Sequence, residues 1–152
     1  MKLVGFRVLC EGEEYIEEIP KAARKLKERM EEIQHVMNEG QQIGAFVVEA
    51  GSPEEDGYWV GIEVSTFEDV PSSMATLTIP PQTYATIQHK GPNDQIRETY
   101  TALHKWTAIQ GYRRANHRWS LEIYHQENDP ENVCEVQVEL CDPIYLKSYG
   151  EV

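Results

Sequence analysis

The chain has 152 residues and a formal net charge of −12 at pH 7, which is long enough for one domain with its own hydrophobic core. This acidity argues against a phosphate-binding surface, because affinity for nucleic acid depends on Lys and Arg side chains that neutralise phosphates. No run approaches the ~20 apolar residues of a membrane span, and the N-terminus lacks the pattern of a signal peptide. We therefore expect a cytoplasmic protein that contacts neither membrane nor nucleic acid directly.

The first half of the chain has the pattern of a strand, a helix and two more strands. Residues 3–10 are mostly apolar and predict a strand. From Ile19 to Met37, apolar residues recur at helical spacing with charged residues between them, which predicts a helix with Pro20 in its first turn. The next two predicted strands, joined by a turn that contains Gly and Pro, are residues 43–50 and 58–65.

The second half repeats this order after a Pro- and Ser-rich connector at residues 67–81, in which we expect no independent domain. A helix is predicted from Ile96 and ends near Gly111, because glycine is common just after a helix terminus. The strands predicted around this helix are residues 82–91, 119–126 and 133–140, and an acidic, Pro-containing turn joins the last two.

The repeated order defines the expected architecture. We expect one domain over residues 1–152, built from pseudo-repeats at about 1–66 and 82–142. Strands joined by a hairpin turn are antiparallel neighbours. The sequence therefore predicts an α+β fold, in which a tandem strand-helix-strand-strand repeat forms one curved antiparallel sheet. The two main helices would lie on one face with a groove between them, and such a groove is a common place for a ligand.

An ordered set of features covers residues 79–140: a Pro-rich entry, a strand that ends in glycine, an aromatic helix, and a strand with a glutamate before an acidic turn. The residues that carry this pattern are Ile79, Pro80, Tyr84, Gly91, Tyr100, Leu103, Trp106, Gly111, Glu122 and Tyr124. The pattern resembles the GyrI-like family, the effector-binding domains of AraC-type and MerR-type multidrug transcription regulators. Those regulators also carry a helix-turn-helix domain, for which this chain has no room, so the resemblance implies a stand-alone domain.

The resemblance implies a role for Glu122, which lies in the middle of the strand predicted at residues 119–126. In multidrug-binding members, a glutamate on this strand lies in a central pocket and faces cationic drugs. A solvent-facing glutamate is the alternative interpretation of the strand by itself. Alternation places Tyr124 on the same face as Glu122. A buried, unpaired carboxylate is unfavourable, so it must bind a proton or a cation. The other candidate ligand contacts are Tyr100, Trp106, Glu135, Gln137, Phe46, Trp59 and Tyr84.

Three functions are compatible with this pattern. The first is a binding protein that holds hydrophobic, cationic drugs or toxins, as a sensor or by sequestration. The second is a hydrolase of strained, cyclopropane-bearing toxins, an activity that the resemblance implies for some members, with Glu122 as general acid or base and Tyr100 or Tyr124 assisting. The third is an inhibitor that binds a protein, because the family takes its name from a member that acts on DNA gyrase. Its contacts would be the acidic turns 54–56 and 127–131.

The sequence predicts no metal site and no cofactor. Cys10, Cys134 and Cys141 are few and lack the spacing of metal ligands, and we expect Cys10 and Cys134 to be small core residues. The histidines show no convincing ligand spacing. The one local basic cluster is interpreted as the end of a helix and a loop; it comprises Arg113, Arg114, His117 and Arg118.

Overall fold

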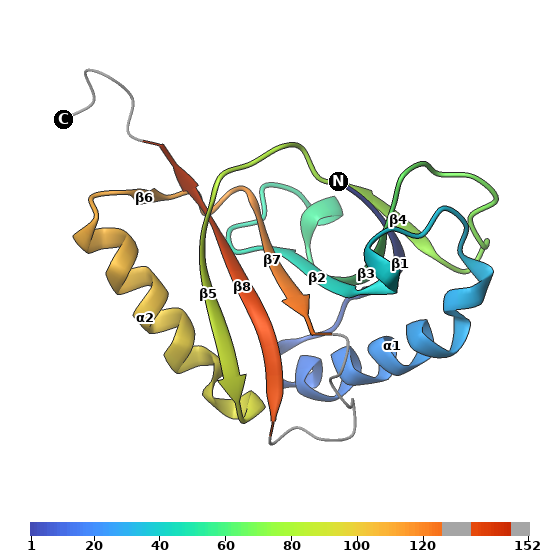
Figure 1. The fold of residues 1–152 in the computed structure, drawn as a ribbon, viewed down its shortest axis with the longest axis horizontal. Coiled ribbons are helices and arrows are strands. Elements are labelled where there is room, and N and C mark those ends of the chain that lie inside the picture. The colour runs from blue at the N-terminus through green and yellow to red at the C-terminus, as the bar shows by residue number, and fades with distance from the viewer. Residues whose placement is uncertain (126–134, 147–152) are drawn as a thin grey trace.

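The structure is a computed structural model, and it describes residues 1–125 and 135–146 (Figure 1). Within these two ranges, the fold consists of two α-helices, several short 3-10 turns and an antiparallel sheet. The helices are α1 (Tyr15–Arg29) and α2 (Ile96–Ile109). The strands are β1 (Lys2–Val8), β2 (Gln42–Val47), β3 (Tyr58–Val64), β4 (Ala75–Thr78), β5 (Tyr84–Gly91), β6 (Arg113–Arg114), β7 (Trp119–Tyr124) and β8 (Val136–Tyr145).

The sheet has the order β4-β1-β3-β2-β7-β8-β5, and the short strand β6 pairs with β8. Strands β1 to β4 come from the first part of the chain, and β5 to β8 from the second. The two parts meet where β2 pairs with β7, in a register that aligns Ile43 with Ile123 and Val47 with Trp119. The α+β architecture with one antiparallel sheet confirms the predicted fold class.

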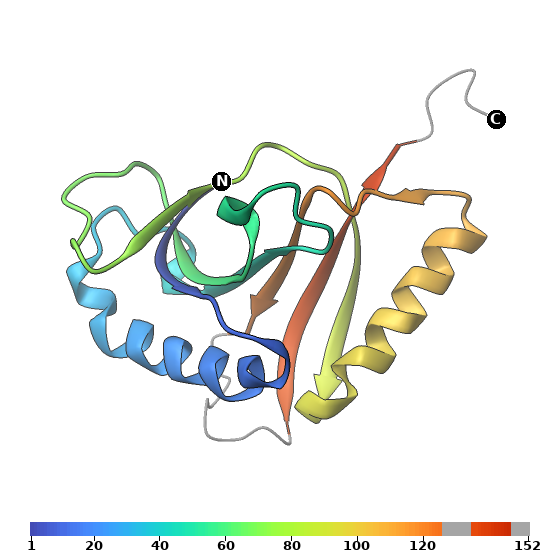
Figure 2. The same cartoon turned by 180° about the vertical axis from the view of Figure 1, so that it is seen from behind.

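Both helices pack on the same face of this sheet. The register places Val60, Gly44, Glu122 and Leu140 side by side across the neighbouring strands β3, β2, β7 and β8. Val60 belongs to the hydrophobic cluster that α1 covers, and Leu140 to the cluster that α2 covers. Figures 1 and 2 show the two helices flanking the sheet on either side of its centre. Gly44 and Glu122 therefore lie between the parts of the sheet that the two helices cover.

The opposite face of the sheet has its own apolar cluster. Its buried members are Leu3, Ile43, Ala45, Val47, Trp59, Ile79, Trp119, Leu121 and Cys141. The connector between β4 and β5 packs here, because Ile79 is buried and the side chain of Gln82 exchanges hydrogen bonds with the backbone of Trp119 at 2.8 and 3.1 Å. We call this side the far face, and the side covered by α1 and α2 the helix face.

The structure corrects three predictions of secondary structure. The first helix was predicted to reach Met37, but α1 ends at Arg29, and Pro20 lies inside it rather than in its first turn. The backbone of Met37 instead donates to Glu63 at 2.8 Å, and Ser65 donates to His35 at 3.0 Å, so this segment pairs with the end of β3.

The other two corrections concern strands. The connector contains strand β4, which pairs with β1 and was not predicted. Strand β8 continues to Tyr145 rather than ending at Leu140, because it pairs with β5 as far as Pro143 and with β6 beyond it. The end of the second helix is confirmed, since α2 ends at Ile109 and Gly111 has the positive φ of 77° that follows many helix termini.

Candidate ligand-binding site

Glu122 occupies the centre of β7 on the helix face, and only 9% of its surface is exposed. Its neighbours across the sheet are Gly44 on β2 and Leu140 on β8, neither of which has a polar side chain. A carboxylate in such a place needs hydrogen bonds or a cation to compensate for the loss of water. The contacts of its two oxygens therefore decide what this site can bind.

Three tyrosine hydroxyls surround the carboxylate. Tyr58 donates to Oε1 at 2.6 Å, and Tyr100 donates to Oε2 at 2.7 Å. Tyr124 lies 3.3 Å from Oε1 and 2.8 Å from the Tyr58 hydroxyl, so its proton is shared between the carboxylate and that phenol. The three tyrosines come from β3, α2 and β7, so both parts of the chain contribute to this cluster, which we call the Glu122 site.

The environment keeps these phenols protonated. Burial is the largest cause that raises the pKa of Tyr58, Tyr100 and Tyr124 above the ordinary value of 10.0, and the nearby charge of Glu122 raises it further. At neutral pH the phenols therefore act as hydrogen-bond donors and the carboxylate as their acceptor.

Among the described residues, the carboxylate has hydrogen-bond donors but no cationic partner. Within residues 1–125 and 135–146, no Lys, Arg or His side chain forms an ion pair with Glu122. Neutral donors stabilise the charge without cancelling it, so the Glu122 site keeps a net negative charge inside an aromatic shell. Chemically, such a site can attract a cation, and aromatic faces add cation–π attraction to it.

A second polar cluster lies between α2 and the sheet, next to Tyr100. The buried side chain of Asp142 accepts from Arg114 at 2.8 Å (Nε to Oδ2) and 3.2 Å (Nη2 to Oδ1). Nε2 of His104 lies 3.8 Å from the same carboxylate, and its ring centroid lies 5.8 Å from that of Tyr100. Burial lowers the pKa of His104, and the charge of Arg114 lowers it further. This cluster fixes α2 to β6 and β8, and with it the position of Tyr100.

The structure brings only some of the predicted site residues together. Tyr100 and Tyr124 contact Glu122, and Phe46 stacks on Tyr58 with ring centroids 5.8 Å apart. Tyr58 itself was not predicted as a site residue. It begins the strand whose next residue, Trp59, was the predicted contact, and adjacent residues of a strand point to opposite faces.

The remaining candidates lie away from Glu122. Trp59 is on the far face, where it packs edge-on against Trp119 at 5.1 Å, and Tyr84 also packs on that face. Trp106 is 47% exposed on α2 and stacks on Tyr112. Glu135 is exposed and precedes β8. A ligand role for these residues stays a prediction.

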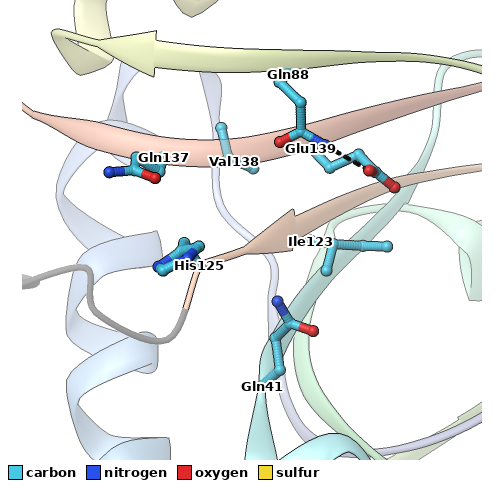
Figure 3. Close-up of a pocket in the computed structure, with 7 residues that line it drawn as sticks. All are labelled: Gln41, Gln88, Ile123, His125, Gln137, Val138 and Glu139. Atoms are coloured by element: carbon cyan, nitrogen blue, oxygen red, sulfur yellow. Dashed lines mark hydrogen bonds between the residues drawn. The ribbon is translucent and has the colours of Figure 1, made fainter.

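Gln137, also a predicted contact, lines a cavity of about 320 Å³ on the far face at the end of β7 (Figure 3). The other lining residues are Gln41, Gln88, Ile123, His125, Val138 and Glu139. Figure 3 shows Gln88 hydrogen-bonded to Glu139 above Ile123. This cavity is separated from Glu122 by the sheet, because Ile123 and Glu122 are successive residues of one strand. The predicted groove between the helices stays a prediction.

Three other features bear on function in the described part of the chain: metal sites, reactive thiols and membrane-spanning helices. It contains no group of three or more His, Cys, Asp or Glu side chains placed to hold a metal ion. Cys10 is half-buried next to β1, and burial raises the pKa of the far-face thiol of Cys141 to about 12, which makes it a poor nucleophile. No helix among these residues is long and apolar enough to cross a membrane. Cys134 and the acidic turn at 127–131 lie outside the described residues.

The basic cluster was interpreted as the end of a helix and a loop, but Arg113 and Arg114 form strand β6, and His117 and Arg118 lie in the turn after it. All four side chains contact other parts of the protein. Arg114 binds Asp142, and the guanidinium groups of Arg113 and Arg118 lie 4.8 and 4.5 Å from the ring centre of Tyr145. His117 hydrogen-bonds to the backbone oxygen of Glu49 at 2.9 Å. The cluster therefore ties β6 and the following turn to β8 and to the loop after β2.

Comparison with known proteins gives one family and several similar structures. The family model described as "GyrI-like small molecule binding domain" matches residues 1–143. No curated protein matches the chain. The chain is similar to SAV2435, whose structure was solved bound to tetraphenylphosphonium, with 13% identity, a TM-score of 0.67, and 95% of this chain and 88% of that chain covered.

Two further proteins have the same fold in their solved structures. The C-terminal domain of EcmrR is 21% identical with a TM-score of 0.64, over 95% of this chain and 90% of that chain; in a complex of EcmrR with DNA, the chain covers 53% of EcmrR. A hydrolase encoded by lin2189 from Listeria innocua is 16% identical with a TM-score of 0.53, over 95% and 86% of the two chains.

Proposed function

The chain belongs to the GyrI-like small molecule binding domain family, and from this premise we propose that it binds hydrophobic, cationic small molecules at Glu122. The ligand would be a lipophilic drug or toxin, and the protein would act as its sensor or sequester it. The observation that carries the proposal is a buried carboxylate with three neutral hydrogen-bond donors and no cationic partner among the described residues. The similar protein SAV2435 was solved with a hydrophobic cation, tetraphenylphosphonium, which supports this class of ligand.

The physical argument is that neutral hydrogen-bond donors stabilise a carboxylate but, unlike a cation, do not neutralise its charge. Phenol donors reduce the free-energy cost of burying the carboxylate, but the negative charge remains. A lipophilic cation gains from this charge in a poorly solvated place, where electrostatic attraction is stronger than in water. It also gains from the rings of Tyr58, Tyr100 and Phe46, through apolar contact and cation–π attraction. A neutral molecule of the same shape would gain only the apolar contact.

The test is to titrate the purified protein with tetraphenylphosphonium, by calorimetry, for wild type and for Glu122→Gln. The substitution keeps the shape of the side chain and removes its charge. A charge-assisted contact contributes ~1.5–3 kcal/mol, so we expect the affinity to fall about tenfold or more.

The matched control is Glu139→Gln, because Glu139 lies on the adjacent strand β8 with its side chain on the far face. It makes the same change in net charge, and we expect wild-type affinity from it. Neutral triphenylphosphine oxide should bind the wild type weakly and Glu122→Gln equally weakly. Equal binding of the cation by wild type and Glu122→Gln would refute the proposal.

Hydrolysis at the same residues is a second candidate function. It is favoured by the short contact of 2.7 Å between the Tyr100 hydroxyl and Glu122, which pairs a proton donor with a potential general base, and by the similarity to the Listeria hydrolase. The distinguishing measurement is product formation from a cyclopropane-bearing electrophile under single-turnover conditions. Turnover by wild type that is lost in Glu122→Gln would establish hydrolysis. If wild type binds cations but shows no turnover, binding would be the one remaining function of the two.

A further inference from the structure

Tyr58 reaches Glu122 by crossing a strand. Tyr58 belongs to β3 and Glu122 to β7, and β2 lies between them in the sheet. The hydroxyl of Tyr58 nevertheless lies 2.6 Å from Oε1 of Glu122, so its ring has to pass over the backbone of β2. It passes at Gly44, the residue of β2 that is directly opposite Glu122 in the register.

The ring uses the space that a side chain at position 44 would fill. A Cβ atom built on Gly44 would lie 1.7 Å from the Tyr58 hydroxyl oxygen, 2.3 Å from Cζ and 2.9 Å from Cε1. Non-bonded heavy atoms prefer a separation of about 3.5 Å, so the ring would have to move by roughly 1.5 Å or more. A shift of this size would break the hydrogen bonds of the Tyr58 hydroxyl to Glu122 and Tyr124, now 2.6 and 2.8 Å long.

The backbone gives no other reason for glycine here. Gly44 does not have the positive φ that excludes other residues, unlike Gly40 and Gly57. Glycine inside a strand weakens it, and its presence often marks the close approach of another group. Two residues further along β2 and on the same face, Phe46 stacks on the Tyr58 ring with an interplanar angle of 19°. Strand β2 therefore leaves space at Gly44 and provides the Phe46 ring beside it. The Tyr58 ring occupies that space and stacks on Phe46.

We infer that Gly44 is a positioning residue of the Glu122 site, because its missing side chain lets Tyr58 lie across β2 and hold one oxygen of the carboxylate. A side chain at this position would lift the phenol from the sheet toward the space between α1 and α2. Gly44 would thereby control both the orientation of the carboxylate and the space available to a ligand. The effect on ligand affinity rests on the proposed function, whereas the effect on Tyr58 does not.

The first test compares Gly44→Ala with Gly61→Ala in tetraphenylphosphonium titrations. Gly61 is the matched control, because it is a strand glycine of β3 whose added Cβ would meet Leu3 Cβ at 3.0 Å on the far face. We expect Gly44→Ala to weaken binding about tenfold, because the carboxylate loses the donor that holds its orientation, and Gly61→Ala to bind within about twofold of wild type. Equal effects of the two substitutions would overturn the inference.

A double-mutant cycle shows whether Gly44 acts through Tyr58. In the wild-type background, Tyr58→Phe should weaken tetraphenylphosphonium binding about tenfold. In the Gly44→Ala background, the same substitution should change the affinity by less than about twofold, because the hydroxyl has already left the carboxylate. Additive effects would overturn the inference. If Gly44→Ala does not fold, recovery of folding by the added substitution Tyr58→Leu supports a clash with the ring, and failure to recover contradicts it.

A readout without ligand separates this inference from the proposed function. Tyrosines buried beside Glu122 resist ionisation, so the phenolate absorbance of the folded protein counts those that are accessible to base. We expect Gly44→Ala to ionise one more tyrosine than wild type and Gly61→Ala to ionise the same number. If wild type does not bind tetraphenylphosphonium, the proposed function fails while this titration still decides the inference. An unchanged number of ionised tyrosines in Gly44→Ala would overturn it.

Discussion

Removing the hydroxyl of Tyr100 tests how far the Glu122 site depends on its hydrogen bonds. Among the described residues, Tyr100 is the one side chain that donates to Oε2 of Glu122, at 2.7 Å, and the carboxylate is 9% exposed. Tyr100→Phe keeps the ring and leaves that oxygen buried without its donor. The loss of a hydrogen bond to a charged group costs about 1.5–3 kcal/mol of the free energy of unfolding. For a chain of this length, that lowers Tm by roughly 3–12 °C.

The same structure predicts a smaller effect for Tyr124→Phe. The Tyr124 hydroxyl lies 3.3 Å from Glu122 and 2.8 Å from the neutral Tyr58 hydroxyl, so its main bond joins two uncharged groups. Such a bond contributes only about 0.5–1.5 kcal/mol. The control is Tyr145→Phe, whose ring keeps its contacts with Arg113 and Arg118 at the end of β8, far along the sheet from Glu122.

The assay is urea unfolding of these variants and wild type, followed by far-ultraviolet circular dichroism and extrapolated to water. The expected order of destabilisation is Tyr100→Phe, then Tyr124→Phe, then Tyr145→Phe. A Tyr100→Phe variant as stable as Tyr145→Phe would refute the reasoning, because it would mean that the buried carboxylate gains nothing from this donor.

Two further predictions follow from the same contacts. Burial raises the pKa of Tyr58, Tyr100 and Tyr124 in the folded protein. Above about pH 10 the unfolded chain therefore releases phenol protons that the folded protein keeps. The free energy of unfolding is unaffected below that pH and falls above it by about 1.4 kcal/mol per pH unit for each phenol. Urea titrations at several alkaline pH values should give a shallower fall for Tyr100→Phe, and an identical slope would contradict this account. Arg114→Met leaves the buried carboxylate of Asp142 without its bidentate partner and should lower the free energy of unfolding in urea by about 3 kcal/mol. Adding Asp142→Asn should recover part of this loss. An Arg114→Met variant as stable as wild type would contradict the pairing.

Alternation along strands was the most informative part of the sequence. It placed Glu122 and Tyr124 on one face of the predicted strand, and the structure has both on the helix face. The helix predicted from the spacing that includes Tyr100 is also confirmed, because α2 is amphipathic and ends just before Gly111, which has a positive φ. These features depend on local periodicity, which a single sequence carries.

The missed features depend on pairing between distant segments. The apolar spacing from Ile33 to Met37 fits a helix, but pairing of this segment with the end of β3 supplies different partners for its backbone groups. Strand β4 forms because the free edge of β1 is available to it. Tyr58 and Trp59 are adjacent aromatic residues, and only the register of β3 with β1 and β2 decides which of them shares the face of Glu122.

The division of the Glu122 site between the two parts of the chain has an evolutionary consequence. The carboxylate, Tyr100 and Tyr124 are encoded in the second half of the chain, whereas Tyr58 and the glycine beneath it are encoded in the first. Mutations in the first half can therefore reshape the space around the charge while the charge itself is retained. Under the proposed function, ligand shape and ligand charge would then be selected separately, and related proteins would diverge toward different ligands without rebuilding the site.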